Sequence, residues 1–330
     1  MERIEIASGI APVCRVGLGT WAAGGWMWGG SDESDAIETV VSALDMGVNL
    51  VDTAPVYGFG AAEDIVGKAL RRRGKRDEAV IATKVGLAWE NSSRPVRDAR
   101  AQRIEKEIED SLRRLGVEAI DLYQVHWPDP KTPIEETAQA MKKLLDAGKI
   151  RAVGVSNFSC EEMQAFAAVC PIATSQPPYN IFERGMETTI LPYCKAHGIK
   201  MLGYGALCRG LLSGKITAES RFHGDDLRNG DPKFLEPRLS QYLAAVRRLD
   251  DLARGRFGKT VLELAVRWVL DRGVEVALWG ARRPHQLHGM EGVFGWKLGQ
   301  EEMEAIDKIL AEEIQDPVGP EFMAPGVRQD

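Results

Sequence analysis

The chain contains the run Ile120-Asp121-Leu122-Tyr123-Gln124-Val125-His126, an apolar stretch of strand length that stops at a polar side chain. Two earlier runs, Val48–Asp52 and Ala79–Lys84, have the same form. If these strands are parallel neighbours, their carboxyl ends share one rim of the sheet. We therefore expect Asp52, Lys84 and His126 to converge there, together with Tyr57, which follows the first run. An acid, a phenol, an amine and an imidazole in one pocket can transfer protons.

The same kind of run recurs along the chain and alternates with amphipathic segments. Predicted strands lie near residues 15–19, 48–52, 79–84, 120–126, 151–155, 172–176, 199–204 and 274–279. Predicted helices lie near residues 32–46, 61–73, 101–115, 134–147, 160–169, 186–197, 259–272 and 301–313. This alternation predicts a parallel sheet covered by helices. The even spread of the units favours a closed (β/α)8 TIM barrel, of the α/β class, over a doubly wound sheet.

Three segments do not follow the alternation. Residues 3–14 form a short apolar alternation around Gly9, which predicts an N-terminal β-hairpin at the bottom of the barrel. Residues 213–258 are rich in Gly, Arg and Asp and predict a long loop insertion on the C-terminal face, where binding loops belong. The tail, residues 314–330, contains several prolines, so we expect it to be irregular and to fold over the rim. We interpret residues 1–330 as one domain.

Composition excludes several classes of partner. A net charge of −6 argues against a broad nucleic-acid surface. The five cysteines are scattered, which favours reduced thiols in the cytoplasm and argues against a structural zinc site. The sequence begins without the apolar stretch of a signal peptide, and no apolar run approaches the ~20 residues of a membrane span. We expect a cytoplasmic protein with a small-molecule partner, and the oligomeric state stays open.

The four converging side chains suggest a reaction. Tyr57 is the candidate general acid, although a free phenol has a pKa of ~10. The ammonium of Lys84 is expected to lower that pKa, and Asp52 to hold the ammonium in place. His126 could orient a carbonyl oxygen. Such a site suits protonation of an oxygen while a hydride reaches carbon, and since no side chain donates a hydride, a nicotinamide cofactor is needed.

Candidate cofactor residues follow the later strands. Ser156, Asn157 and Gln176 could hold a carboxamide, and the ring of Tyr204 could stack on the nicotinamide. After the eighth strand a turn of small residues leads to Arg282 and Arg283, in the region where this fold commonly binds phosphate. Two adjacent arginines suggest an additional phosphate, and hence NADP over NAD.

Each of these residues also has a structural interpretation. Ser156-Asn157 could cap a helix, Gln176 and Tyr204 could fill the core, and the arginines could form an exposed loop. The tryptophans Trp21, Trp89 and Trp127 either line a substrate pocket with Tyr57 and His126 or only pack. We expect no metal, because His285 and His288 have no nearby carboxylate or cysteine ligand. The run Gly17–Ala22 imitates a dinucleotide fingerprint, but a flexible glycine-rich loop follows it where that motif needs a helix.

Taken in order, these motifs resemble the aldo-keto reductase family over roughly residues 3–310. The matching stretches are Gly17–Trp21, Asp52-Thr53-Ala54 with Tyr57-Gly58, Ala82–Lys84, Asp121–Asp129, Gly154–Phe158, Gln176–Asn180, Tyr204–Leu207 and Gly280–Arg282. The run Tyr204–Leu212 is most similar to a bacterial branch related to sugar and general stress reductases. The resemblance implies a barrel with NADPH across its rim and a catalytic tetrad of Asp52, Tyr57, Lys84 and His126. It further implies cofactor contacts from Thr20, Trp21, Asp52, Ser156, Asn157, Gln176, Tyr204, Leu207, Arg209, Gly280, Arg282 and Gln286.

The resemblance is incomplete at two places. Gly289 and Met290 stand where many members carry an acid and an asparagine that hold the adenine, and Gly205-Ala206 replaces a Ser-Pro pair beside the nicotinamide. The expected activity is NADPH-dependent reduction of aldehydes, ketones or sugars to alcohols. The alternatives are a catalytically weak, NADP-binding regulatory barrel and a lyase or isomerase that uses Lys84 as a Schiff-base amine.

Overall fold

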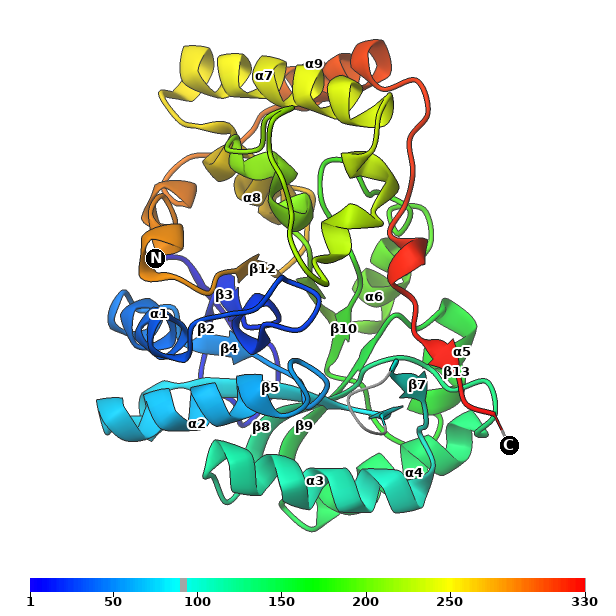
Figure 1. The fold of residues 1–330 in the computed structure, drawn as a ribbon. Helices are drawn as coiled ribbons and strands as arrows, with labels where there is room; N and C mark the ends of the chain where they lie inside the picture. The colour runs from blue at the N-terminus through cyan, green and yellow to red at the C-terminus, as the bar shows by residue number, and fades with distance from the viewer. Residues whose placement is uncertain (90–93, 330) are drawn as a thin grey trace.

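The computed structural model describes residues 1–89 and 94–329. Residues 90–93, within the loop after Gly86, and Asp330, at the end of the tail, lie outside the described part. Eight parallel strands close into a barrel in the spatial order β10-β11-β12-β3-β4-β5-β8-β9 (Figure 1). Their bounds are β3 (Val16–Gly19), β4 (Leu50–Asp52), β5 (Val80–Val85), β8 (Ile120–Val125), β9 (Ile150–Ser156), β10 (Thr174–Gln176), β11 (Lys200–Gly203) and β12 (Val276–Gly280). All eight predicted strands are present, and the (β/α)8 fold is confirmed.

Helices surround the barrel where the sequence predicts them. Their bounds are α1 (Glu33–Asp45), α2 (Ala61–Arg73), α3 (Ala101–Leu115), α4 (Ile134–Asp146), α5 (Cys160–Ala167), α6 (Ile190–His197), α8 (Val261–Asp271) and α9 (Gln300–Glu313). On α3 the buried side chains of Ile104, Ile108 and Leu115 form one stripe against the sheet. The helix ends because Gly116 takes a left-handed conformation.

The inside of the barrel has two layers, which follow from the two-residue period of its strands. Leu50, Val80 and Leu122 belong to an apolar cluster toward the amino ends of the strands. Asp52 lies two residues beyond Leu50 on β4, and Gln124 lies two residues beyond Leu122 on β8. Lys84 lies four residues beyond Val80 on β5. All three polar residues are buried. The polar groups are therefore confined to the carboxyl end of the barrel.

The predicted N-terminal hairpin closes the other end. Strands β1 (Arg3–Ile4) and β2 (Val13–Cys14) pair in antiparallel fashion, and Gly9 between them has a φ of 79°. Ile6, Ile10 and Val13 join the apolar cluster inside the barrel. The hairpin thus covers the interior layer away from the polar groups.

The prediction of a continuous loop insertion over residues 213–258 was wrong for its second half. Helix α7 (Arg238–Phe257) occupies that part and packs against α8 and α9. The buried residues Tyr242, Val246, Leu249 and Ala253 recur at helical spacing. The composition of the preceding Gly- and Asp-rich part hid this pattern. Residues 214–237 hold only short 3-10 turns, at Leu227–Asn229 and Pro232–Phe234.

The tail crosses the C-terminal face of the barrel. In Figure 1 it runs from α9 along one side of the molecule to a short strand, β13 (Gly326–Val327). Strand β13 pairs with β7 (Val96–Arg97), which in turn pairs with β6 (Leu87–Ala88) in the loop after β5. On the way, Met323 reaches the large cavity described below.

Candidate active site

The ends of strands β4 and β5 hold a compact group of polar atoms. Lys84 is fully buried, and its Nζ lies 2.5 Å from Asp52 Oδ1, 3.0 Å from the Thr53 carbonyl oxygen and 3.2 Å from the Tyr57 hydroxyl. The rings of Tyr57 and His126 meet edge to face, with centroids 5.7 Å apart. The structure therefore brings together all four residues that were expected to converge.

The loop that carries Tyr57 is held by close backbone packing. A Cβ at Gly24 would lie 2.5 Å from the Tyr57 carbonyl carbon and oxygen, so no larger residue fits there without displacing this loop. Trp21 stacks on the Tyr57 ring at 5.9 Å between centroids. The phenol is thereby fixed above Lys84.

Burial and charge set the protonation states of these groups. Burial, aided by the charge of Asp52, raises the pKa of Tyr57 well above its usual range. The expectation of a lowered pKa was wrong, because burial of the phenol and then the negative charge of Asp52 outweigh the neighbouring ammonium. Burial, with a contribution from Lys84, holds the pKa of His126 well below its usual value. Tyr57 is thus a protonated donor and His126 a neutral imidazole at neutral pH.

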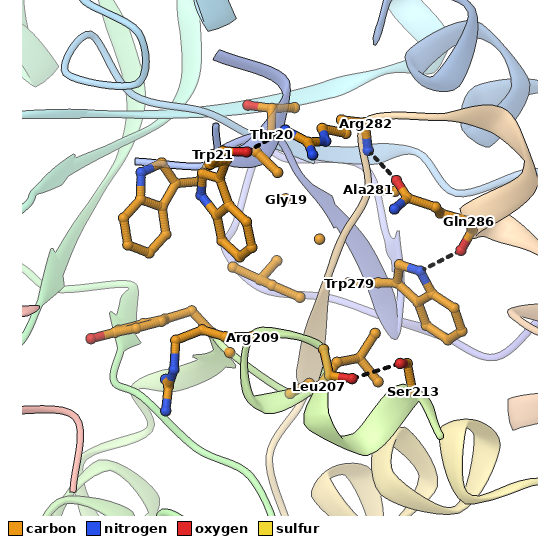
Figure 2. Close-up of a pocket in the computed structure, with 18 of the residues that line it drawn as sticks. Gly19, Thr20, Trp21, Leu207, Arg209, Ser213, Trp279, Ala281, Arg282 and Gln286 are labelled. Carbon is orange, nitrogen blue, oxygen red and sulfur yellow. Dashed lines mark hydrogen bonds between the residues drawn. The ribbon is translucent and has the colours of Figure 1, made fainter. Parts of the chain in front are cut away.

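Asp52 and Tyr57 help to line a large cavity, and Figure 2 shows part of its lining. Ten of the residues expected at the cofactor line it: Thr20, Trp21, Asp52, Gln176, Tyr204, Leu207, Arg209, Gly280, Arg282 and Gln286. Ser156 and Asn157 are not among the lining residues. Ser156 Oγ donates to the Gln176 carbonyl, and Asn157 Oδ1 accepts from the Tyr204 hydroxyl at 3.0 Å. Both residues therefore support the wall of the cavity from behind.

Several of the lining side chains are already bonded within the protein. Arg209 is buried, donates to Asp231 at 2.5 Å and to Glu183, and its guanidinium lies apart from Arg282 in Figure 2. Gln286 Oε1 accepts from the backbone nitrogens of Arg282 and Arg283, so it caps the turn after β12. The side chains of Arg209 and Gln286 are therefore held in place by contacts within the protein.

Comparison with known proteins places this site in a family. The profile of the Aldo/keto reductase family matches residues 15–311. The chain belongs to the aldo/keto reductase family. The protein is therefore an oxidoreductase of a family that acts on small carbonyl compounds with a nicotinamide cofactor.

Individual relatives of this reductase agree in length and fold. It is 57% identical to "Aldo-keto reductase YhdN" of Bacillus subtilis (strain 168) over the whole of both chains. It is 33% identical to "NADH-specific methylglyoxal reductase" of Escherichia coli (strain K12), with 87% of this chain and 91% of the relative covered. A solved structure, the glycerol dehydrogenase AKR11B4 from Gluconobacter oxydans, superposes with a TM-score of 0.88 at 54% identity and covers 98% of this chain and 99% of its own.

The reductase has an aromatic cluster next to the cavity. Trp26, Tyr57, Trp89 and Trp127 pack around Ala54, Val56 and Leu87. Arg97 lies over the Trp127 ring at 5.0 Å, and Arg103 over the Trp89 ring at 5.4 Å. Of the residues expected at the substrate, Trp21 and Tyr57 line the cavity, whereas Trp89, His126 and Trp127 belong to the region beyond Tyr57.

Sequence reasoning missed a contact across the mouth of the cavity. The backbone nitrogens of Met27 and Gly29 donate to Asp225, and Arg282 donates to the Trp28 carbonyl. Arg228 lies 5.3 Å from the Trp28 ring centroid, and both residues line the cavity. The glycines around Trp28 and the Asp-Arg content of residues 225–228 were visible in the sequence, but nothing in it indicated that the two loops meet.

Other features of the reductase can be stated briefly. Among residues 1–89 and 94–329 no three His, Cys, Asp or Glu side chains group in a way that could hold a metal ion. Within the same ranges, no helix is long and apolar enough to cross a membrane.

Proposed function

We propose that the protein is an NADPH-dependent reductase of small aldehydes, ketones or sugars, with Tyr57 as the general acid. The observation that carries the proposal is the Asp52–Lys84–Tyr57 chain of contacts, at 2.5 and 3.2 Å, beside a neutral His126. Asp52 and Lys84 hold the phenol, and His126 can donate an N–H to the carbonyl oxygen of a substrate. A cytoplasmic location and a single-domain organisation are part of the same proposal.

The cavity suits an extended dinucleotide. A side chain at Gly280 would meet no protein atom within 4 Å and would occupy open space in the cavity that this residue lines. Gln176 and Tyr204 stand at the end near Tyr57, where a nicotinamide would lie. When bound, the cofactor supplies a hydride to the carbonyl carbon. As the hydride reaches carbon, the two π electrons of the C=O bond would move to oxygen, which would take the Tyr57 proton and become the hydroxyl of an alcohol.

The preference for NADP rests on charge at the other end of the cavity. The residues that line the cavity include Arg228, Arg282, Lys215, His285 and His288. Burial and then the neighbouring Arg283 and Arg228 lower the pKa of Arg282, and Asp226 only partly opposes this. Excess positive charge favours a phosphate ester over a free hydroxyl. Met290, in contrast, is fully buried, so it offers no surface to an adenine.

The two alternatives differ in what they require. A Schiff-base mechanism needs an accessible amine, whereas Lys84 is fully buried and donates to three oxygens. A regulatory barrel needs cofactor binding without turnover. The geometry disfavours the Schiff-base mechanism, and the regulatory barrel is one possible outcome of the test below.

The test is consumption of NADPH or NADH by the purified protein with aromatic aldehydes, dicarbonyls and sugars. We predict that Tyr57→Phe lowers turnover roughly 10²–10⁴-fold, because the phenol is the proton donor, while the dissociation constant for NADPH changes little. Near-normal turnover in the variant would contradict the assignment of Tyr57. Tight NADPH binding by the unmodified protein without any turnover would support the regulatory alternative.

A further inference from the structure

Gln124 is a buried amide inside the barrel that the proposed function does not use. It lies on β8 in register with Lys84 of β5, and its side chain has no exposed surface. Its Nε2 donates to Asp52 Oδ2 at 3.1 Å, and its Oε1 accepts from Gln176 Nε2 at 3.1 Å. A buried amide costs free energy unless it is hydrogen-bonded. The contacts of Gln124 satisfy that requirement through two residues of the candidate site.

The carboxylate of Asp52, which is paired with Lys84, determines how both amides must be turned. Its Oδ1 accepts from Lys84, and its Oδ2 accepts from Gln124 and, at 2.8 Å, from Gln176. Because a carboxylate only accepts, each glutamine must turn its NH₂ group toward Asp52. The Gln124 oxygen then faces Gln176 and takes its second N–H. With both N–H groups engaged, Gln176 presents its amide oxygen to the cavity that it lines.

Space for Gln124 exists because its neighbour on β9 is a glycine. Gly154 is the register partner of Gln124 on one side and of Thr174 on the other. A Cβ at position 154 would lie 2.8 Å from Gln124 Cγ and 2.4 Å from Thr174 Oγ1. The backbone is therefore shaped to admit the amide at this position.

We propose that Gln124 is a positioning residue that fixes the Gln176 amide with its oxygen toward the nicotinamide end of the cavity, so that Gln176 accepts from an N–H of a pyridine carboxamide. The inference rests on the proposed function, since it assigns that end of the cavity to the nicotinamide. Asp52 is the common anchor, which means that the proton-transfer group and carboxamide recognition share one hydrogen-bond network. Removing Gln124 leaves a single hydrogen bond, from Gln176 Nε2 to Asp52, to hold the Gln176 amide, so that the amide can pivot about that bond and its oxygen can move away from the carboxamide.

The test compares binding of NADP⁺ and of its 3-acetylpyridine analogue, in which a methyl group replaces the carboxamide NH₂. The protein should bind NADP⁺ roughly 10-fold or more tightly than the analogue, because a buried acceptor without a donor is costly. In Gln124→Met we expect the dissociation constant of the analogue divided by that of NADP⁺ to fall to about 1–3. In the same variant, the alkaline limb of the pH profile of kcat should shift upward by about half a pH unit. The rise follows because Asp52, with one donor fewer, holds the protons of Lys84 and Tyr57 more strongly.

Two variants separate positioning from packing. Leu122→Met changes a residue of β8 that, like Gln124, lies inside the barrel. It should keep the wild-type ratio of the two dissociation constants. Gln124→Glu should also keep it, because a carboxyl group beside Asp52 retains its proton and can donate to Asp52 while accepting from Gln176. A wild-type ratio in folded Gln124→Met, or loss of the ratio in Leu122→Met, would overturn the inference. If the unmodified protein binds neither dinucleotide, the proposed function itself fails, and this inference with it.

Discussion

At the residue scale, the ammonium group of Lys84 contacts both a carboxylate oxygen of Asp52 and the hydroxyl oxygen of Tyr57. Lys84 has no exposed surface, and burial lowers its pKa against the opposing effect of Asp52. It keeps Asp52 and the Tyr57 hydroxyl within hydrogen-bond distance of one nitrogen atom. In the proposed function the phenol acts as proton donor because of its position, since its pKa is raised and not lowered.

Arg228 provides a prediction about cofactor choice. It lines the charged end of the cavity and pairs with Asp226 at 2.6 Å. Arg228→Met should raise the dissociation constant for NADPH roughly 5–50-fold and change that for NADH less than threefold, since only NADPH carries the additional phosphate. Fluorescence titration at two ionic strengths measures the dissociation constants for NADPH and NADH. Arg221→Met, an exposed change in the same insertion, is the matched control, and equal losses for both cofactors would refute this role.

At the element scale, the regular part of the chain was predictable and the loops were not. Strand and helix positions follow from local apolar spacing, which also placed Asp52, Lys84 and His126 at strand ends. The meeting of residues 25–30 with residues 223–228 and the pairing of β13 with β7 depend on contacts between distant segments. Helix α7 is an intermediate case, because its spacing was present but was masked by the composition beside it.

Helix α3 provides a prediction about pH. Burial raises the pKa of Glu107 to about 7, against lowering contributions from Arg103 and the Gly86 amide. The folded state therefore holds a proton that the unfolded chain releases near the ordinary glutamate pKa of 4.5. This contribution to stability is complete below pH 4.5 and is lost as the pH rises through about 7.

The midpoint of thermal unfolding should fall between pH 5 and pH 8, and Glu107→Gln should reduce this fall by a few degrees. Glu105→Gln, on the exposed side of the same helix, should leave the dependence unchanged. An unaltered slope in Glu107→Gln would show that another group is responsible.

At the scale of the whole molecule, the tail ties the last residues to the middle of the chain. The Arg328 guanidinium donates to Asp129 and Thr132, beside the β13–β7 pairing. Asp129 also accepts from the Ala99 amide nitrogen and from Thr132, so loss of Arg328 does not leave it unbonded.

Arg328→Met should therefore lower the unfolding midpoint by only about 1–3 °C while it accelerates amide hydrogen exchange in residues 314–329 at least several-fold. Hydrogen exchange followed by mass spectrometry measures the exchange rate in these residues. Arg113→Met, at a well-exposed surface pair, controls for loss of charge, and unchanged exchange in the tail would mean that β13 holds without the arginine.

The hairpin at the bottom of the barrel has a consequence for proton supply. Ile6, Ile10 and Val13 lie within an apolar layer on the side of Lys84, Asp52 and Gln124 away from the cavity, and an apolar layer is unfavourable for water. We therefore expect a proton that Tyr57 gives up in the proposed reaction to be replaced from the cavity. We expect the Tyr57 hydroxyl to be reprotonated once per catalytic cycle, after the product has left and while solvent can reach the phenol.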